Sequence, residues 1–235
     1  FGPGHAGQGG HLVDQDGLQF GRGQGHGASP EALQVVGVGA HPAYPDLQGF
    51  GRRPMTLPAA ELEAILIYQM AALAGMARTE GLAMVHVKPH GALSNMACVD
   101  ATLAGTVVTA IRAFDASLIL LAPACSALAA AGRRAGLRVV EEIFADRAYQ
   151  DDGSLVPRSR PDALIRGAAA SLAHVLAMLE AGALISVNGT HRPTPIGSIC
   201  VHGDSPEAVA TARVLRAGLL ERGYRLAGLE AIAAD

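Results

Sequence analysis

Short apolar runs alternate with longer stretches rich in alanine and leucine from about residue 35 to the C-terminus. The apolar runs predict buried β-strands at residues 35–41, 83–88, 118–124, 138–145 and 198–202. The longer stretches predict helices at residues 59–80, 99–114, 126–136, 167–182 and 205–223. Strands that alternate with helices favour a parallel sheet with crossover helices on its faces. The sequence therefore predicts an α/β fold, and its length suits one domain over residues 35–235.

The first 34 residues have a different character. They are dominated by glycine, with glutamine and histidine interspersed, and they contain no periodic apolar stripe. Residues 1–34 are therefore predicted to be an atypical segment that lies outside the domain formed by the rest of the chain and does not fold with it.

A polar cluster stands at the end of four of the predicted strands. In a closed β/α array, parallel strands point the same way, so their C-terminal ends gather on one face of the fold. That face is where we expect the chemistry. The candidate residues there are His41, Lys88, His90, Asp146, Arg147, His202 and Asp204.

The start of the last long helix falls directly after one of these clusters. Ser205 offers a helix cap, Pro206 suits the first helical position, and Glu207 places an acid in the first turn. Free backbone N–H groups at such a helix start favour an anionic ligand close to His202.

Bulk composition argues against several classes of partner. The formal net charge is -3 and the arginines are scattered, which gives no basic surface for nucleic acid. No apolar run approaches the roughly 20 residues that span a bilayer, and the N-terminus lacks a signal pattern, so we expect a cytoplasmic protein without a membrane partner. The three cysteines show no metal or disulfide spacing, and Cys200 is expected to be a small buried apolar residue.

Lys88 is the only lysine among the 18 basic residues of the chain. A lone lysine after an apolar run indicates a position that needs a compact ammonium, suited to an oxyanion or a phosphate. His90 and His202 suit a general base, a metal ligand or a hydrogen-bond donor. Arg147 and Arg158 offer guanidinium groups for a carboxylate or phosphate.

These clusters, taken in order, resemble the LamB/YcsF family. The matching motifs are Gly-Ala-His-Pro-Ala-Tyr-Pro-Asp-Leu (39–47), Gly-Phe-Gly-Arg-Arg (49–53), Tyr-Gln (68–69), Lys-Pro-His-Gly-Ala-Leu (88–93) with Asn95, Phe-Ala-Asp-Arg-Ala-Tyr (144–149), Leu-Val-Pro-Arg (155–158) and Cys-Val-His-Gly-Asp (200–204). The resemblance begins near residue 37 and runs to the C-terminus.

The resemblance implies a distorted seven-stranded β/α barrel, TIM-like and of the glycoside hydrolase/deacetylase type. It also implies activity as the A subunit of an ATP-dependent 5-oxoprolinase, which works with B and C subunits to open the lactam of 5-oxo-L-proline to L-glutamate. ATP, with Mg²⁺ as its usual counter-ion, is the expected cofactor, and no tightly bound metal is expected. The resemblance and the chemistry together give a catalytic set of Lys88, His90, Asp146, His202 and Asp204. They give a substrate-binding set of His41, Tyr44, Asn95, Arg147 and Arg158.

The chain also departs from the family at its start. Family members begin with an Asp-Leu-Asn-x-Asp-x-Gly-Glu motif and continue to Asn-x-x-Cys-Gly-Phe-His-Ala-Gly-Asp, and neither stands in residues 1–34. Ser94 also replaces a usual tyrosine. One hypothesis is that residues 1–34 are an out-of-frame reading of the coding DNA. If they are genuine, the barrel lacks its first two strands and we expect weak stability and little activity.

Two alternative functions remain open at this stage. One is a metal-dependent deacetylase or related C–N hydrolase, in which histidines hold a divalent ion that activates water. The other is a binding subunit whose catalysis is impaired because the N-terminal motifs are missing.

Overall fold

A computed structural model describes residues 18–21, 38–203 and 206–233 of the chain. The strands of the main sheet are β1 (Leu18–Gly21), β2 (Val38–Ala40), β3 (Met84–Val87), β4 (Ile119–Pro123), β5 (Arg138–Phe144), β8 (Ile196–Cys200) and β9 (Arg225–Leu226). A separate hairpin is formed by β6 (Ala183–Ile185) and β7 (His191–Pro193). The helices are α1 (Ala59–Thr79), α2 (Gly91–Ala97), α3 (Ala101–Asp115), α4 (Ala127–Arg134), α5 (Ala168–Ala181), α6 (Ala208–Glu221) and α7 (Leu229–Ile232).

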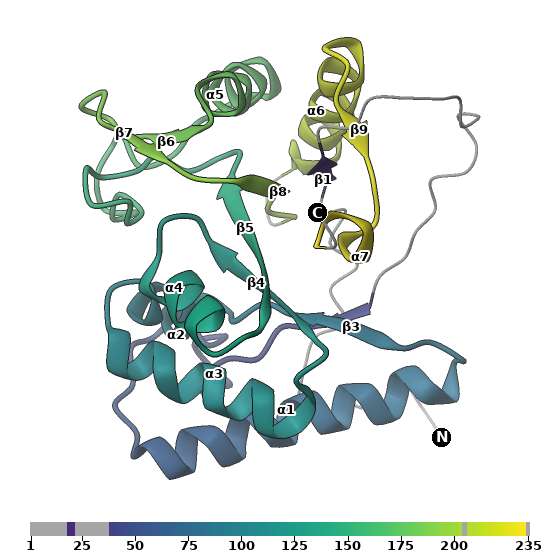
Figure 1. Cartoon of the computed structure of the whole chain (residues 1–235). Helices are drawn as coiled ribbons and strands as arrows, with labels where there is room; N and C mark the ends of the chain where they lie inside the picture. The colour runs from purple at the N-terminus through teal and green to yellow at the C-terminus, as the bar shows by residue number, and fades with distance from the viewer. Residues whose placement is uncertain (1–17, 22–37, 204–205, 234–235) are drawn as a thin grey trace.

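The main sheet has seven strands in the order β2-β3-β4-β5-β8-β1-β9 (Figure 1). The five strands from β2 to β8 pair in parallel, which confirms the predicted α/β fold with crossover helices. By contrast, β1 pairs antiparallel with both β8 and β9. Residues 18–21 were predicted to lie outside the sheet, and that prediction is wrong for these four residues. Residues 18–21 join the sheet because β1 pairs with a strand on each side, and no local apolar pattern in the sequence reveals such pairing.

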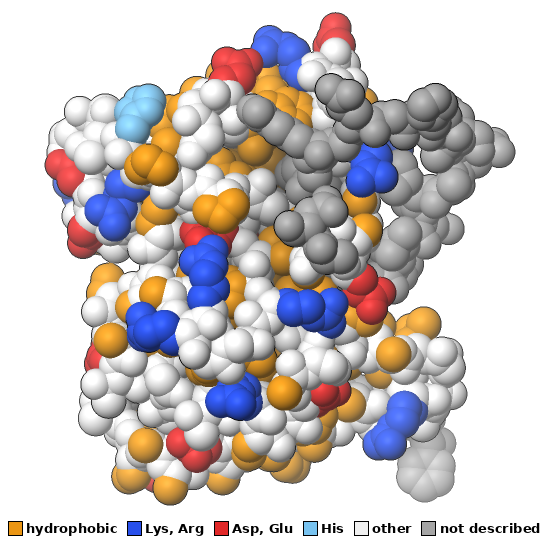
Figure 2. Space-filling model, in the orientation of Figure 1, with side chains coloured by type: hydrophobic (Ala, Val, Ile, Leu, Met, Phe, Trp, Pro, Cys, Tyr) orange, Lys and Arg blue, Asp and Glu red, His pale blue; other side chains and the backbone are white. Residues whose placement is uncertain are grey.

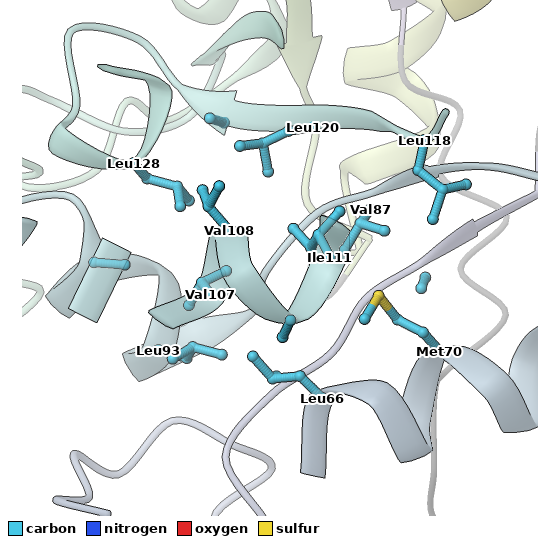
Figure 3. Close-up of a cluster of buried hydrophobic side chains, with 14 of the residues drawn as sticks. Leu66, Met70, Val87, Leu93, Val107, Val108, Ile111, Leu118, Leu120 and Leu128 are labelled. Carbon is cyan, nitrogen blue, oxygen red and sulfur yellow. The ribbon is translucent and has the colours of Figure 1, made fainter. Parts of the chain in front are cut away.

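The described residues form two large apolar cores and two smaller clusters. One large core lies beneath α1 to α4, and the other lies beneath α5 and α6. Figure 3 shows Leu66 and Met70 of α1 pointing toward Ile111 of α3 and Val87 of β3. These apolar residues recur at helical spacing along α1 and α3, so each helix buries one face. Burial of these faces holds the helices against the sheet and so holds the strands, with the loops that follow them, in place.

Side-chain caps explain where two of the helices begin. Asp100 accepts hydrogen bonds from the backbone N–H groups of Thr102 and Leu103 at the start of α3. Ser126 caps α4 in the same way. The predicted cap of the last long helix is wrong in detail, because α6 begins at Ala208 after Glu207 without a side-chain cap bond. Ser205 lies outside the described residues.

Helix α1 has the length and apolar composition of a membrane span, contrary to the expectation that no such stretch exists. Its residues Leu62, Leu66, Met70 and Leu73 are buried against the domain core, so the helix packs one face onto the domain. Tyr68 stands on the opposite face and is exposed. Within the described residues, Figure 2 shows Lys and Arg side chains as separate patches on the visible face rather than as one broad basic surface.

Candidate functional site

The loops after β2 and β3 run side by side and bring two predicted histidines together. The backbone N–H of Lys88 donates to the carbonyl of Ala40 over 2.8 Å, and that of His90 donates to the carbonyl of Pro42 over 2.9 Å. These bonds continue the parallel pairing beyond the strands. The rings of His41 and His90 consequently lie with their centroids 4.6 Å apart. The structure thus places the ends of the first two parallel strands at one site, as the sequence predicted.

His41 is held in one protonation state and one tautomer. Its Nδ1 lies 2.5 Å from the carbonyl oxygen of Lys88, which only accepts, so Nδ1–H donates and Nε2 is left as an acceptor. Burial, followed by the positive charge of Lys88 and the proximity of His90, lowers the pKa of His41 to about 3. His41 is therefore a neutral imidazole at physiological pH.

The loop after β2 is fastened to the start of α2 by close backbone contact. Gly91 has a φ of +61°, and a Cβ there would lie 2.5 Å from the carbonyl oxygen of Gly51. The N–H of Ala92 donates to that same oxygen over 2.9 Å. Asp46 steadies the other end of the loop, since its carboxylate accepts from the guanidinium of Arg53 over 2.8 Å. Gly51 and Gly91, one from each loop motif, thus allow the close backbone contact that positions His90.

The side chain of Lys88, which follows β3, is buried and contacts residues of β5 and β8, which lie beyond β4 in the strand order. Its Nζ lies 2.5 Å from Oε2 of Glu142 and 3.2 Å from Sγ of Cys200. The hydroxyl of Ser198 donates to the other carboxylate oxygen of Glu142 over 3.1 Å. Register explains the grouping, because Glu142 pairs with Ser198 and Phe144 pairs with Cys200 across the two strands. This buried set is called the Lys88–Glu142–Cys200 cluster below.

The charges of this cluster are almost fully removed from water. Lys88 is 8% exposed, Glu142 2% and Cys200 3%. Burial acts to lower the pKa of Lys88, but the Cys200 sulfur and the Glu142 carboxylate outweigh it, so the pKa lies above its usual value. Burial raises the pKa of Cys200 to about 12, and the charge of Lys88 opposes that rise. Lys88 is consequently a fixed cation at neutral pH.

Asp146 and His202 form a second group at the ends of β5 and β8. The His202 Nδ1 lies 2.8 Å from both carboxylate oxygens of Asp146. The imidazole stacks on Phe144 with centroids 5.6 Å apart, and Lys88 Nζ lies 5.7 Å from that same phenyl ring. Phe144 therefore stands between His202 and the buried cluster. A carboxylate on Nδ1 orients the ring and leaves Nε2 to exchange a proton with a ligand.

Arg147 lies beneath the loop that follows β5. It is 6% exposed, its Nη2 donates to the carbonyl of Val156 over 2.8 Å, and its buried Nε has no hydrogen-bond partner. Burial and the nearby charge of Arg158 lower its pKa. The carboxylate of Asp146, the preceding residue, pairs with His202 rather than with this guanidinium. Arg158 itself is exposed.

Two further predicted residues, Tyr44 and Asn95, stand apart from these groups, and the position of a third is not described. Tyr44 is buried in the core beneath α1 to α4, where its hydroxyl lies 3.6 Å from the sulfur of Met96. Asn95 is exposed on α2. Asp204 lies outside the described residues. The substrate-binding or catalytic roles expected of these residues stay predictions, as do the roles of the residues that the structure brings together.

The sequence reasoning missed Glu142 and Ser198 and treated Cys200 as an ordinary apolar residue. A pair of acids inside a strand rich in β-branched residues was the available signal, because neighbouring positions in a strand point to opposite faces and one of the two must point inward. That inward acid needs a buried cation, and the sequence offers a single lysine at the end of an apolar run.

The other acid of the pair, Glu141, faces the opposite side of β5 beside a separate cavity of about 640 Å³. Its carboxylate accepts from the N–H of Cys125 over 2.7 Å and is also bonded by Thr194 and Arg133. Arg192 lines the same cavity. None of the residues predicted for the site lines this cavity. Within the described residues, no cluster of three or more His, Cys, Asp or Glu has the arrangement of a metal site.

Comparison with known proteins assigns the chain to a family. The model of the LamB/YcsF family matches residues 30–234. The chain belongs to the LamB/YcsF family. It is 59% identical over 194 residues to the 5-oxoprolinase A subunit of Azoarcus sp. (strain BH72), a match that covers 83% of this chain and 76% of the relative. It is 51% identical over 194 residues to the 5-oxoprolinase A subunit of Methylococcus capsulatus, covering 83% and 75%.

A solved structure of similar sequence has the same fold. The lactam utilization protein from Thermus thermophilus superposes with a TM-score of 0.73 at 40% sequence identity, covering 80% of this chain and 75% of that one. The family resemblance expected from the strand-end motifs is thereby confirmed. Those motifs supply His41, Lys88, Asp146 and His202, which the fold brings to the ends of neighbouring strands.

Proposed function

We propose that this LamB/YcsF protein is the A subunit of an ATP-dependent 5-oxoprolinase, which opens the lactam of 5-oxo-L-proline to give L-glutamate. The observation that carries the proposal is the identity of 59% with a 5-oxoprolinase A subunit over 83% of the chain. The grouping of His41, Lys88, Asp146 and His202 at the strand ends supports it, because these positions lie in the motifs that carry the family resemblance.

The chemistry of a lactam explains why ATP is needed. Amide resonance makes the carbonyl carbon a poor electrophile, so transfer of a phosphoryl group from ATP to the carbonyl oxygen creates a leaving group and an electrophilic carbon. ATP is a co-substrate in this scheme, with Mg²⁺ as its counter-ion. The reaction then requires a group that moves protons and groups that hold two anions, the substrate carboxylate and the phosphate.

The residues of the site suit these tasks. His202, oriented by Asp146 through Nδ1, transfers protons at Nε2. Neutral His41 accepts a hydrogen bond at Nε2 from the substrate, and His90 lies beside it. Arg147 and Arg158 hold the carboxylate or the phosphate. Asp204, Tyr44 and Asn95 complete the proposed site on the strength of the family motifs alone.

The proposal extends to the setting of the enzyme. The relatives are named as A subunits, so we infer that this chain works in a complex with B and C subunits. We also infer a cytoplasmic location, where ATP is available. We further propose that the complete fold is a distorted seven-stranded β/α barrel, with the strand ends of β2 to β8 around its mouth.

The test is glutamate release from 5-oxoproline by this chain with B and C subunits and ATP. We expect release that depends on all three subunits, and a loss of kcat by about 100-fold or more in His202→Ala, because a positioned acid–base group contributes that much. The matched control is His191→Ala, an exposed histidine of the β6–β7 hairpin, which should retain activity.

Three results would contradict the proposal. Stoichiometric zinc that survives dialysis and is needed for activity would favour the deacetylase-like hydrolase. Binding of 5-oxoproline without any glutamate release would favour a protein that only binds. Full activity of His202→Ala would remove His202 from its proposed role.

A further inference from the structure

The Lys88–Glu142–Cys200 cluster places a thiol, a carboxylate and an ammonium together in the interior beneath the strand-end site. Lys88 Nζ touches both other groups, at 2.5 Å from Glu142 Oε2 and 3.2 Å from Cys200 Sγ. Glu142 is anchored by Ser198, and Phe144 connects the cluster to His202 above it. A buried charge pair beside an apolar thiol is costly to build, and packing alone would be served better by apolar residues.

These three groups are the parts that covalent acyl transfer requires. A thiol becomes a strong nucleophile when a base removes its proton and a cation stabilises the thiolate. Lys88 is the cation in contact with the sulfur, and Glu142 is the carboxylate next to that cation. The same ammonium is placed to stabilise negative charge that develops on a carbonyl oxygen during attack.

We propose that Cys200 is the nucleophile that attacks the lactam carbon, with Glu142 as the base and Lys88 as the electrostatic stabiliser. This inference rests on the function proposed above. It assigns a covalent route to a reaction for which the strand-end histidines alone would provide direct attack by water.

Each step of this route balances. The Cys200 thiol gives its proton to Glu142, and its sulfur forms a bond to the lactam carbon, whose oxygen carries the phosphoryl group. Phosphate then leaves with the electron pair of the carbon–oxygen bond and takes up the proton from Glu142. Water adds across the carbon–nitrogen double bond of the resulting cyclic thioimidate, the remaining carbon–nitrogen bond breaks, and the nitrogen leaves as an amine that carries both protons of that water. The product is a γ-glutamyl thioester on Cys200. A second water hydrolyses this thioester, which releases glutamate and returns a proton to sulfur.

Burial explains why the thiol needs both partners. Because burial raises the pKa of Cys200 to about 12, the free thiol is protonated at neutral pH, and the proton has to leave as the sulfur–carbon bond forms. Cys98 provides a contrast within the same protein. Burial also raises the pKa of its thiol to about 12, but its hydrogen-bond partners are the hydroxyls of Ser94 and Ser126, and it therefore serves as the control.

The experiment traps the thioester during turnover of the complete assembly of this chain, B and C subunits, ATP and 5-oxoproline. Acid quench followed by peptide mass spectrometry should find one glutamyl group on the peptide that contains Cys200. Hydroxylamine added to the quenched protein should remove it as the hydroxamate. We expect Cys200→Ala and Cys200→Ser to lose about 1,000-fold or more in kcat, while Cys98→Ala keeps the activity of the unmodified chain.

The Cys200→Ser variant separates a catalytic role of Cys200 from a merely structural one. Cys200→Ser keeps the shape of the side chain and a hydrogen bond to Lys88, so it should fold and bind 5-oxoproline in calorimetry while failing to turn over. Glutamate release by Cys200→Ser or Cys200→Ala within about threefold of the unmodified chain, or no acyl adduct during turnover, overturns the inference and leaves the 5-oxoprolinase proposal standing. No glutamate release by the unmodified assembly overturns both.

Discussion

Replacement of Glu142 by glutamine keeps the shape of the side chain but leaves the Lys88 ammonium buried without its counter-charge. The two groups lie 2.5 Å apart and are 8% and 2% exposed, so water cannot compensate for the loss. Removal of one partner from such a buried pair costs about 3–5 kcal/mol. With an m-value of about 2 kcal/mol/M, the urea midpoint should fall by about 1.5–2.5 M.

A double-mutant cycle tests the origin of that loss. Lys88→Met combined with Glu142→Gln removes the stranded charge and should recover most of the stability that Glu142→Gln loses. The matched control is Glu180→Gln, which breaks an exposed ion pair with Arg222 at 2.9 Å and should change stability by less than about 0.5 kcal/mol. A Glu142→Gln midpoint within about 0.3 M of that of the unmodified chain would show that Glu142 does not offset the buried charge of Lys88.

The sign of the pH dependence follows from the raised pKa of Lys88 in the folded state. Its contribution to stability is fully present below the ordinary lysine pKa, about 10.4, and is lost as the pH rises beyond that value. Urea midpoints should therefore show no contribution from this pair to any change between pH 7 and 9. A fall in that range that disappears in Lys88→Met would contradict the assignment.

Three further predictions follow from the loops that seat the site. NMR of His41 should show a neutral ring from pH 5 to 8, and since its folded pKa is about 3, stability should fall as the pH drops below the ordinary histidine value, less so in His41→Gln. The pKa of Asp46 is held at about 2, chiefly by its hydrogen bond with Arg53, so urea midpoints should fall as the pH drops from about 4 to about 2, with a shallower slope in Asp46→Asn. Gly91→Ala should lower the unfolding free energy by more than about 1 kcal/mol, whereas Gly105→Ala, with open space at its Cβ, should raise it by about 0.5–1 kcal/mol.

The parallel strands were predictable because burial on both faces leaves a continuous apolar run. The run at 118–124 is of this kind and predicts β4, which the structure places at Ile119–Pro123. The segment 138–145 is more mixed, and its β-branched residues predict β5, which the structure places at Arg138–Phe144. Strand β1 was not predictable, because its place between β8 and β9 depends on pairing rather than on any pattern in residues 18–21. Apart from β1, whose residues 18–21 pair within the main sheet, the division of the chain into residues 1–34 and 35–235 stays a prediction.

The position of several candidate residues at strand ends was predictable, but their partners were not. Parallel strand ends predict that Asp146 and His202 share a face, yet the contact between residues 56 positions apart depends on how β5 and β8 lie in register. The partner of Lys88 depends on the same register. Alternation alone cannot decide which of two adjacent glutamates, Glu141 or Glu142, points inward.

A crystal structure of this chain, assembled with the proposed B and C subunits and with 5-oxoproline bound, would locate the substrate directly. We expect the ring between His41 and His202, its carboxylate on Arg147 or Arg158, and its carbonyl carbon facing Lys88. A ring bound elsewhere, with no contact to these residues, would rule out the proposed site.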